Sequence, residues 1–480
     1  MALPGLRFRV ARLTLACAAV ALAGAAVVGQ TFRSADPATD IAKVDAVFSR
    51  WTTATPGCSV GASVKGRVVV NKAYGMADLE HDVPNTADTI FEAGSVSKQF
   101  TAAGVLLLAR EGKLKLDDPV RKYVPELPDY GSPLTIRHML MHMSGLRDWG
   151  SVESIAGWPR TTRVYTHAHV LDIVSRQKSL NFTPGSQYSY SNTGYNLAVI
   201  IVTRVSGMPF AEFEKQRLFT PLGMTRTSWR DDFTRVVKSR AIAYEQQGES
   251  YAQDMPFENV HGNGGLLTTV GDLLKWNENF VKPVVGDASF VAEQQVPGAF
   301  NDGRPGSYAL GLMIGTYRGL REVGHSGSTA GYRAHLVRYP DQGVSVVVLC
   351  NASTGAATQY AHAVAEVLLP GAFTTAAAGG RAGGAAPAPR LTPTAAQLQA
   401  MVGTYVSDEA ETTLIAAVTD GTLVLRRRPD TVIRLVPTAT ADVFTGGSLG
   451  TVTFRRDAAG RVTALSVRQE RVFDLRFDRR

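Results

Sequence analysis

The stretch 100–109 limits most tightly how this chain can fold, because its residues are apolar or small nearly all round. A helix of that composition has no face suited to water and must lie inside a domain. Gly112, just beyond a basic last turn, suits the end of such a helix. The preceding residues 91–98 predict a turn that leads straight into the helix, with Gly94 loosening the backbone before Ser95.

Ser95 and Lys98 stand three residues apart at the start of this helix and therefore share one of its faces. A hydroxyl at the positive end of a buried helix, with an amine one turn on, has the arrangement of a nucleophile and its base. The alternative is that Ser95 caps the helix and Lys98 is a solvated charge. Ser-x-x-Lys alone does not decide between the two interpretations.

Two later stretches form a set with this one. Tyr190-Ser191-Asn192 follows the turn 183–185, and His325-Ser326-Gly327 precedes another glycine-rich turn. Together with residues 95–98, in this order, they resemble the three motifs of penicillin-binding proteins and class C β-lactamases. The neighbouring segments that also resemble this family are 142–146, 188–197 and 264–269.

The resemblance covers about residues 40–370 and implies an α/β fold. That fold is a β-lactamase-like antiparallel sheet flanked by helices, with an all-helical lobe and the active site between them. The chain pattern agrees, because strands at both ends of a mainly helical middle predict one sheet built from distant parts of the chain. The expected helices are 41–51, 135–142 and 194–205, and the expected strands are 58–64, 66–74, 321–325, 331–339 and 344–350.

The resemblance implies catalytic roles for Ser95, Lys98 and Tyr190. Ser95 would attack a carbonyl carbon and become acylated. Free lysine and tyrosine side chains have pKa values near 10, so neither is a base at neutral pH unless the site lowers its pKa. The two would titrate as a coupled pair, and the sequence leaves open which of them takes the proton. The alternative for Tyr190 is a packed aromatic beside the Pro184-Gly185 turn.

The family's substrate-binding roles fall on Asn192, His325, Gly327 and Ser328. Asn192 would orient substrate and the lysine, although it could equally cap the helix that follows. Gly327 would let the backbone approach the reacting oxygen, so that the N–H groups of Ser95 and Ser328 form the oxyanion hole. The alternative for 325–328 is an ordinary glycine turn between strands.

His325 departs from the pattern of true β-lactamases, which have lysine at this position. A lysine there is a permanent cation for a substrate carboxylate, whereas a histidine is mostly neutral at pH 7. Relatives with His-x-Gly are mostly peptidases and esterases. We therefore expect peptidase or esterase chemistry more than efficient β-lactam hydrolysis.

Residues 1–29 have the pattern of a signal peptide. A basic start with Arg7, Arg9 and Arg12 leads into an uncharged run, 13–28, followed by small residues suited to cleavage. The alternative is an uncleaved membrane anchor, because the run is slightly longer than a usual signal core. We expect a periplasmic or extracellular protein with no membrane segment other than this one.

The composition of the chain excludes several other classes of function. Of 480 residues, 45% are hydrophobic and 19% charged, which is an ordinary globular balance. Loss of the three N-terminal arginines lowers the formal charge from +8 to +5, which implies no polyanionic partner and no nucleic acid. No phosphate-binding glycine loop occurs, and His138, His142 and His261 do not have the spacing of a metal site. We expect no cofactor and no metal, and a small molecule or short peptide as substrate.

The last part of the chain reads as a separate small unit. Residues 371–390 are an Ala/Gly/Pro linker without a hydrophobic period, which separates the hydrolase-like domain, 36–370, from residues 391–480. Short strands and hairpin turns predict a C-terminal all-β, barrel-like domain. The arginines at 426–428 and 455–456 are best explained by a solvated sheet face. The expected strands are 422–425, 432–436, 451–454, 462–467 and 472–477.

Cys58 and Cys350 are the two cysteines that remain after signal removal. In the family fold the first and last strands of the main sheet are antiparallel neighbours, so the resemblance implies that the two cysteines could face each other as a disulfide. The alternative is a pair of buried thiols.

The sequence as a whole predicts a secreted serine hydrolase that acts through an acyl-enzyme. Its expected substrates are amides or esters, including peptides of D-amino acids. A β-lactamase is one alternative. A penicillin-binding sensor or a non-catalytic binding protein is the other. Substrate preference and oligomeric state are not encoded in any motif that we recognise.

Overall fold

The computed structural model describes residue 1 and residues 37–160, 162–374 and 389–480. Apart from its first residue, the predicted signal peptide lies outside these ranges, and so does most of the predicted linker. Among the helices in the described ranges, none combines the length and the apolar character needed to cross a membrane.

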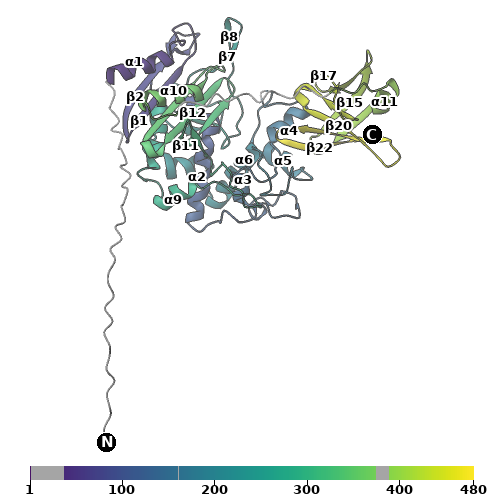
Figure 1. Cartoon of the computed structure of the whole chain (residues 1–480), viewed down its shortest axis with the longest axis horizontal. Coiled ribbons are helices and arrows are strands. Elements are labelled where there is room, and N and C mark those ends of the chain that lie inside the picture. The colour runs from purple at the N-terminus through teal and green to yellow at the C-terminus, as the bar shows by residue number, and fades with distance from the viewer. Residues whose placement is uncertain (2–36, 161, 375–388) are drawn as a thin grey trace.

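The main sheet joins the two ends of the hydrolase-like part of the chain (Figure 1). Strand β1 (Cys58–Val64) pairs antiparallel with β13 (Val344–Cys350) and, on its other side, with β2 (Arg67–Tyr74). The strand order is β10-β11-β12-β13-β1-β2, so the predicted assembly from distant segments is confirmed. The remaining strands of this sheet are β10 (Met313–Tyr317), β11 (Leu320–Thr329) and β12 (Tyr332–Tyr339).

Helices cover both faces of this sheet, which explains why β13 is hydrophobic on both sides. On one face α1 (Pro37–Val47) and α10 (Ala357–Leu368) pack over a core that includes Phe48 and Val346. On the other face lie α8 (Val270–Asn279) and the segment that leads into α2 (Lys98–Arg110). Figure 1 shows α10 and α2 on either side of the strands.

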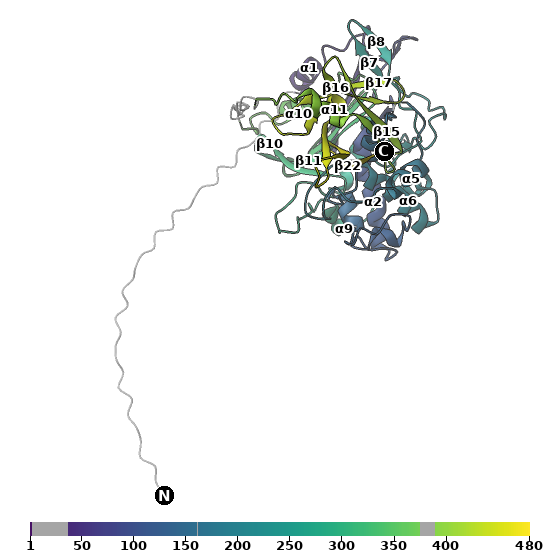
Figure 2. The ribbon, with the colours of Figure 1, turned by 90° about the vertical axis from the view of Figure 1, so that its right-hand side faces the viewer.

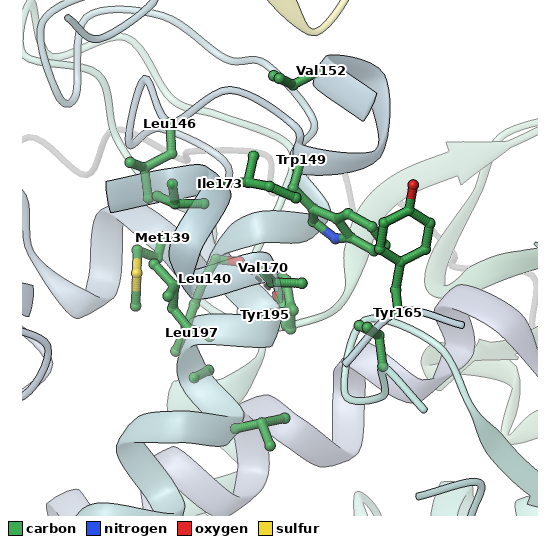
Figure 3. Close-up of a cluster of buried hydrophobic side chains, with 14 of the residues drawn as sticks. Met139, Leu140, Leu146, Trp149, Val152, Tyr165, Val170, Ile173, Tyr195 and Leu197 are labelled. Carbon is green, nitrogen blue, oxygen red and sulfur yellow. Dashed lines mark hydrogen bonds between the residues drawn. The ribbon is translucent and has the colours of Figure 1, made fainter. Parts of the chain in front are cut away.

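Helix α2 is buried from Lys98 to Leu108, as its composition predicts. It packs against α6 (Asn192–Ser206), and around this pair the chain forms the helical lobe. Figure 3 shows part of the core of this lobe, where the Trp149 and Tyr165 rings meet at 5.0 Å. The other helices of the lobe and its surroundings are α3 (Ile136–Leu140), α4 (Trp149–Ala156), α5 (His167–Ser175), α7 (Phe210–Glu214) and α9 (Ala288–Gln294).

Three small sheets complete this part of the chain. The strands are β3 (Met76–Asp78) with β4 (Val83–Pro84), then β5 (Phe91–Glu92) and β6 (Ser228–Trp229) on either side of β9 (Leu266–Thr268), and β7 (Tyr244–Gln247) with β8 (Ser250–Gln253). The sheet of β5, β9 and β6 matters for the site, because its strand β5 ends two residues before Gly94, the first residue of the segment 94–98.

The C-terminal residues form a nine-stranded antiparallel sheet in the order β17-β16-β15-β14-β22-β21-β20-β19-β18. The two edge strands, β17 and β18, are consecutive in the chain, so the sheet curls into the predicted barrel-like shape. The Asp420-Gly421 hairpin turn has positive φ at both residues, as that dipeptide predicts. The elements are α11 (Ala395–Met401), β14 (Gly403–Ser407), β15 (Thr412–Thr419), β16 (Thr422–Arg427), β17 (Thr431–Arg434), β18 (Val436–Pro437), β19 (Val443–Thr445), β20 (Thr451–Arg456), β21 (Val462–Gln469) and β22 (Val472–Arg479).

This C-terminal unit docks on the helical lobe through buried polar contacts, and Figures 1 and 2 show its strands lying against that lobe. The Arg147 guanidinium pairs with Glu409 at 3.0 Å and donates to the carbonyl of Phe473 at 2.9 Å. Arg427, which the sequence analysis placed on a solvated face, instead donates to the carbonyl of Ser154 at 2.6 Å. That expectation was wrong for Arg427, because burial against a second domain leaves no periodic signal within a short strand.

Cys58 and Cys350 stand directly opposite each other in the β1–β13 register and form a disulfide with an S–S distance of 2.08 Å. The bond joins residues 292 positions apart, so it closes nearly the whole hydrolase-like part of the chain into one loop. It lies in the core between the sheet and α10, where both residues are fully buried.

We predict that iodoacetamide leaves Cys58 and Cys350 unmodified in denatured, unreduced protein and modifies both after reduction. The double variant Cys58→Ala/Cys350→Ala should unfold at lower urea concentration, with a loss of about 2–4 kcal/mol, because the unfolded chain regains the freedom of a long loop. Mass spectrometry and urea titration measure the two effects. Modification without reduction, or an unchanged unfolding midpoint, would contradict the assignment.

Candidate active site

Ser95 lies in a single 3-10 turn, Gly94–Ser97, between strand β5 and helix α2. Gly94 has φ +51°, a conformation that favours glycine. The Ser97 hydroxyl fixes the turn, since it donates to the Gly94 carbonyl at 2.6 Å and accepts from the Leu266 N–H at 3.1 Å. Ser95 does not cap α2, because the residue at the cap position is Ser97. Its side chain is partly exposed and free to meet a substrate.

The Lys98 side chain is completely buried and points back at Ser95. Its Nζ lies 3.1 Å from Ser95 Oγ, 2.9 Å from Asn192 Oδ1 and 2.6 Å from the carbonyl oxygen of Asn263. Three acceptors from three separate segments therefore hold the amine in place. The alternative of a solvated lysine does not hold in this structure.

Burial lowers the pKa of Lys98 well below its usual value. The charge of Asp148 raises this pKa, whereas the nearby charges of Arg160 and Arg471 lower it further. A neutral amine within hydrogen-bond distance of a serine hydroxyl is able to take its proton. The electrostatics of the site therefore favour Lys98 as the base.

Tyr190 forms one wall around the amine. Lys98 Nζ lies 4.9 Å from the centre of its ring, and the His142 ring packs on it at 4.1 Å. Burial raises the pKa of Tyr190, while a side-chain hydrogen bond with Ser95 and the charge of Arg471 act in the opposite direction. The raised pKa keeps the proton on the phenol at neutral pH, so this hydroxyl lies beside the serine in its neutral form.

Asn192 is the first residue of α6 rather than its cap, so the capping alternative is not what the structure shows. A residue outside α6 accepts the first backbone N–H of the helix, because the Asn192 N–H donates to Asp148 Oδ2 at 2.8 Å. This frees the side-chain oxygen to accept from Lys98. Asp148 also accepts from the Ser151 N–H at 3.0 Å, which holds the carboxylate in position.

His325 is buried, and both of its ring nitrogens make internal hydrogen bonds. One lies 2.9 Å from the Tyr308 hydroxyl and the other 2.6 Å from the carbonyl oxygen of Ser326. Burial lowers the pKa of His325 to about 3, and the charge of Lys98 lowers it in the same direction. The histidine is therefore neutral and positions the strand and Tyr308, and it brings no positive charge to the cleft.

The backbone of the Ser95 turn lies directly against strand β11. A Cβ added to Gly94 would lie 2.6 Å from the Ser328 amide nitrogen, and one added to Gly327 would lie 2.0 Å from the Ala93 carbonyl oxygen. Only glycine permits this approach. It brings the Ser95 and Ser328 backbones together, which is the placement that the expected oxyanion hole requires.

These groups open into a cleft of about 760 Å³, and one wall comes from the C-terminal unit. The turn Glu470-Arg471, between β21 and β22, reaches this cleft. It is held by the Arg471 carbonyl, which accepts from the Asp148 N–H at 3.3 Å and from Asn181 Nδ2 at 3.1 Å.

The Arg471 guanidinium lies 4.8 Å from the centre of the Tyr190 ring. Within the described ranges, no carboxylate oxygen lies within 4.0 Å of it. Arg471 lines the cleft and brings a positive charge to it. This arrangement suits an anionic group on a bound substrate.

The structure brings together every residue that the sequence analysis proposed for the site. It adds residues that the analysis did not assign to it. His142 belonged to a segment that resembled the family, but no role was attached to it. The other four gave no local signal in the sequence. One contributes a backbone carbonyl oxygen, one a carboxylate at a helix start, one a hydroxyl that contacts His325, and one a side chain from the C-terminal unit. The added residues are Asn263, Asp148, Tyr308, His142 and Arg471.

Comparison with known proteins gives a consistent result. A family model described as Beta-lactamase matches residues 42–369. The chain is similar to a D-aminopeptidase of Cereibacter sphaeroides, with 31% identity over 323 residues that cover 66% of this chain and 60% of that protein. It is also similar to penicillin-binding protein 4* of Bacillus subtilis, with 28% identity over 329 residues, 64% of this chain and 70% of that protein. The chain thus spans 60% of the length of the D-aminopeptidase.

Two solved structures extend the comparison. The octameric penicillin-binding protein homologue from Pyrococcus abyssi superposes with a TM-score of 0.60 at 25% identity, covering 92% of this chain and 98% of that one. The D-amino acid amidase from Ochrobactrum anthropi SV3, complexed with D-phenylalanine, gives a TM-score of 0.58 at 23% identity, covering 68% of this chain and 98% of that one. The likeness to the amidase is a likeness of fold.

We predict that Lys98→Arg lowers the rate of Ser95 labelling by a fluorophosphonate about 10²–10⁴-fold, because a guanidinium stays charged and cannot act as a base. In the wild type the labelling rate should rise with pH as Lys98 loses its proton and reach its plateau well below pH 10. Lys113→Arg, an exposed lysine just past the same helix, is the control. A rate that climbs until about pH 10, near the pKa of free lysine, would contradict the lowered pKa.

Proposed function

Because the chain belongs to the beta-lactamase family, we propose that it is a serine hydrolase that cleaves amide or ester bonds through an acyl-enzyme on Ser95. The observation that carries the proposal is the buried Lys98 amine, 3.1 Å from Ser95 Oγ and lowered in pKa by burial. The Ser95 side chain beside this amine is partly exposed and lines the cleft, so a substrate can reach it.

In the acylation step, Ser95 Oγ attacks the carbonyl carbon of the substrate while Lys98 takes the hydroxyl proton. The negative charge that develops on the carbonyl oxygen is stabilised by the backbone N–H groups of Ser95 and Ser328. When the carbon–nitrogen or carbon–oxygen bond breaks, the leaving group takes a proton from Lys98 directly or through the Tyr190 phenol. A water molecule then attacks the ester on Ser95, and the same groups return the site to its starting state.

We propose further that the substrates are short peptides or amides built from D-amino acids and carry an anionic group. The similarity to D-aminopeptidases supports the D-configured acyl group. The Arg471 guanidinium has no carboxylate partner in the part of the chain that the structure describes. It supports the anionic group, because it could form a charge-assisted hydrogen bond to a carboxylate. Since His325 is neutral, the cation that true β-lactamases carry on the third motif comes here from the C-terminal unit instead.

We predict that the wild type hydrolyses at least one member of a panel of p-nitrophenyl esters, D- and L-aminoacyl p-nitroanilides and nitrocefin, with preference for D-aminoacyl compounds. Ser95→Ala should abolish turnover and fluorophosphonate labelling, because no nucleophile remains, while Ser250→Ala, on the exposed β7–β8 hairpin, retains both. Turnover that survives in Ser95→Ala would contradict the serine-hydrolase proposal. Preference for nitrocefin would indicate a β-lactamase. Labelling without turnover would indicate a penicillin-binding sensor.

We also predict that Arg471→Met lowers kcat/KM about 10-fold to 100-fold more for a substrate with a free carboxylate than for the matching carboxamide. The predicted change in kcat/KM corresponds to the loss of one charge-assisted hydrogen bond, worth about 1.5–3 kcal/mol. Arg468→Met is the matched control, because Arg468 is exposed, is not among the residues that line the cleft, and places its guanidinium carbon 4.3 Å from the centre of the Phe473 ring. Equal loss on both substrates would show that Arg471 does not read the carboxylate.

A further inference from the structure

A second cluster of ligand-type side chains lies outside the cleft, between the main sheet and helix α10. Glu322 on β11, His335 on β12 and His362 on α10 each offer one ligand atom, and these three atoms lie within 4.8 Å of one another. The proposed hydrolase mechanism uses none of the three. Two imidazoles and one carboxylate form a donor set that suits divalent transition metals such as zinc.

The cluster lies on the face of the sheet away from His325. His335 stands directly opposite Ser326 in the β11–β12 register. Successive residues of a strand point to opposite faces, so His335 and His325 lie on opposite sides of the sheet. Helix α10 covers the face that carries His335 and brings His362 over the two strands.

A direct contact between two of the three residues accounts for their positions but leaves the third unexplained. His362 Nε2 lies 2.9 Å from Glu322 Oε2, and together they link α10 to β11. His335 is 6% exposed, and its Nδ1 is bonded to the Thr358 hydroxyl at 3.2 Å. Within the described residues, its Nε2 is buried without any hydrogen-bond partner. A buried imidazole nitrogen without a partner is unfavourable and calls for a ligand.

The state of His335 suits metal binding. Burial lowers the pKa of His335 to about 4, so the imidazole is neutral at pH 7. The Thr358 hydroxyl can accept the Nδ1 proton, which leaves a lone pair on Nε2. Metal-binding histidines are usually held in this way, with the second nitrogen donating to a neighbouring acceptor. The Tyr339 hydroxyl similarly donates to Glu322 at 2.9 Å and orients the carboxylate.

The distances between the three ligand atoms are compatible with tetrahedral coordination of one metal ion. Metal–ligand bonds of about 2.0–2.2 Å place two tetrahedral ligands roughly 3.3 Å apart. His362 Nε2 and Glu322 Oε2 are 2.9 Å apart, and all three ligand atoms lie within 4.8 Å of one another. The side chains of His362 and Glu322 are 16% and 21% exposed, so solvent has access for a fourth ligand.

We propose that Glu322, His335 and His362 bind one divalent transition-metal ion of the zinc type, with water as the fourth ligand. Two nitrogen donors exclude a site built for calcium or magnesium, which take oxygen ligands. The ion would join α10 to strands β11 and β12 behind the catalytic cleft and would stabilise that part of the fold. This site is independent of the proposed hydrolase activity.

The test uses the full-length, tag-free protein after removal of metals with a chelator. We expect calorimetry to show one Zn²⁺ bound per chain, Co²⁺ to give the visible spectrum of a tetrahedral site, and either metal to raise the thermal midpoint. His362→Gln should weaken binding about 100-fold or more, which exceeds what the loss of a supporting partner alone usually costs. Glu322→Gln, which keeps the shape of the side chain, should weaken it in the same way.

His81→Gln is the matched control, because Asp78, Glu80 and His81 form another such group, on a more exposed part of the surface. This variant should bind Zn²⁺ and Co²⁺ like the wild type. The proposal is overturned if the wild type binds neither metal. It is also overturned if His81→Gln loses the metal, or if His362→Gln and Glu322→Gln both keep it with unchanged circular dichroism.

Discussion

The site depends on the removal of one amine from water. Burial lowers the pKa of Lys98, and Ser95, Asn192 and Asn263 each place an oxygen within hydrogen-bond distance of its buried Nζ. The acceptors come from the Ser95 turn, from the start of α6 and from the carbonyl of Asn263. These segments are brought together by tertiary packing alone, so the chemistry exists only when the lobe and the sheet are both in place.

The sequence predicted those parts of the structure that depend on the hydrophobic pattern of a single segment. The bounds of β1 and β13 agree with the expected strands, and α2 is buried all round because no polar face was available. The motifs of Ser95, Lys98 and Asn192 could be located in the sequence, but these residues meet only because α2 packs against α6. The disulfide was one of two alternatives until the register placed Cys58 opposite Cys350.

The parts that the sequence did not predict are set by contacts between distant segments. Nothing near His325 indicates that Tyr308 will occupy one of its nitrogens. An arginine on a short strand looks the same whether it meets water or a second domain, and Arg427 proved to meet the helical lobe. The buried pair of Arg147 and Glu409 belongs to the same class. Such pairs add little net stability, but leaving one member unpaired is costly, so they favour one docked arrangement over others.

Because of the turn that carries Arg471, two units of the chain contribute to the cleft. Ser95, Lys98 and Tyr190 all belong to the hydrolase-like part, whereas one wall of the cleft comes from the C-terminal barrel-like unit. Exchange of the Glu470-Arg471 turn would therefore change one wall of the cleft while Ser95, Lys98 and Tyr190 stay in place.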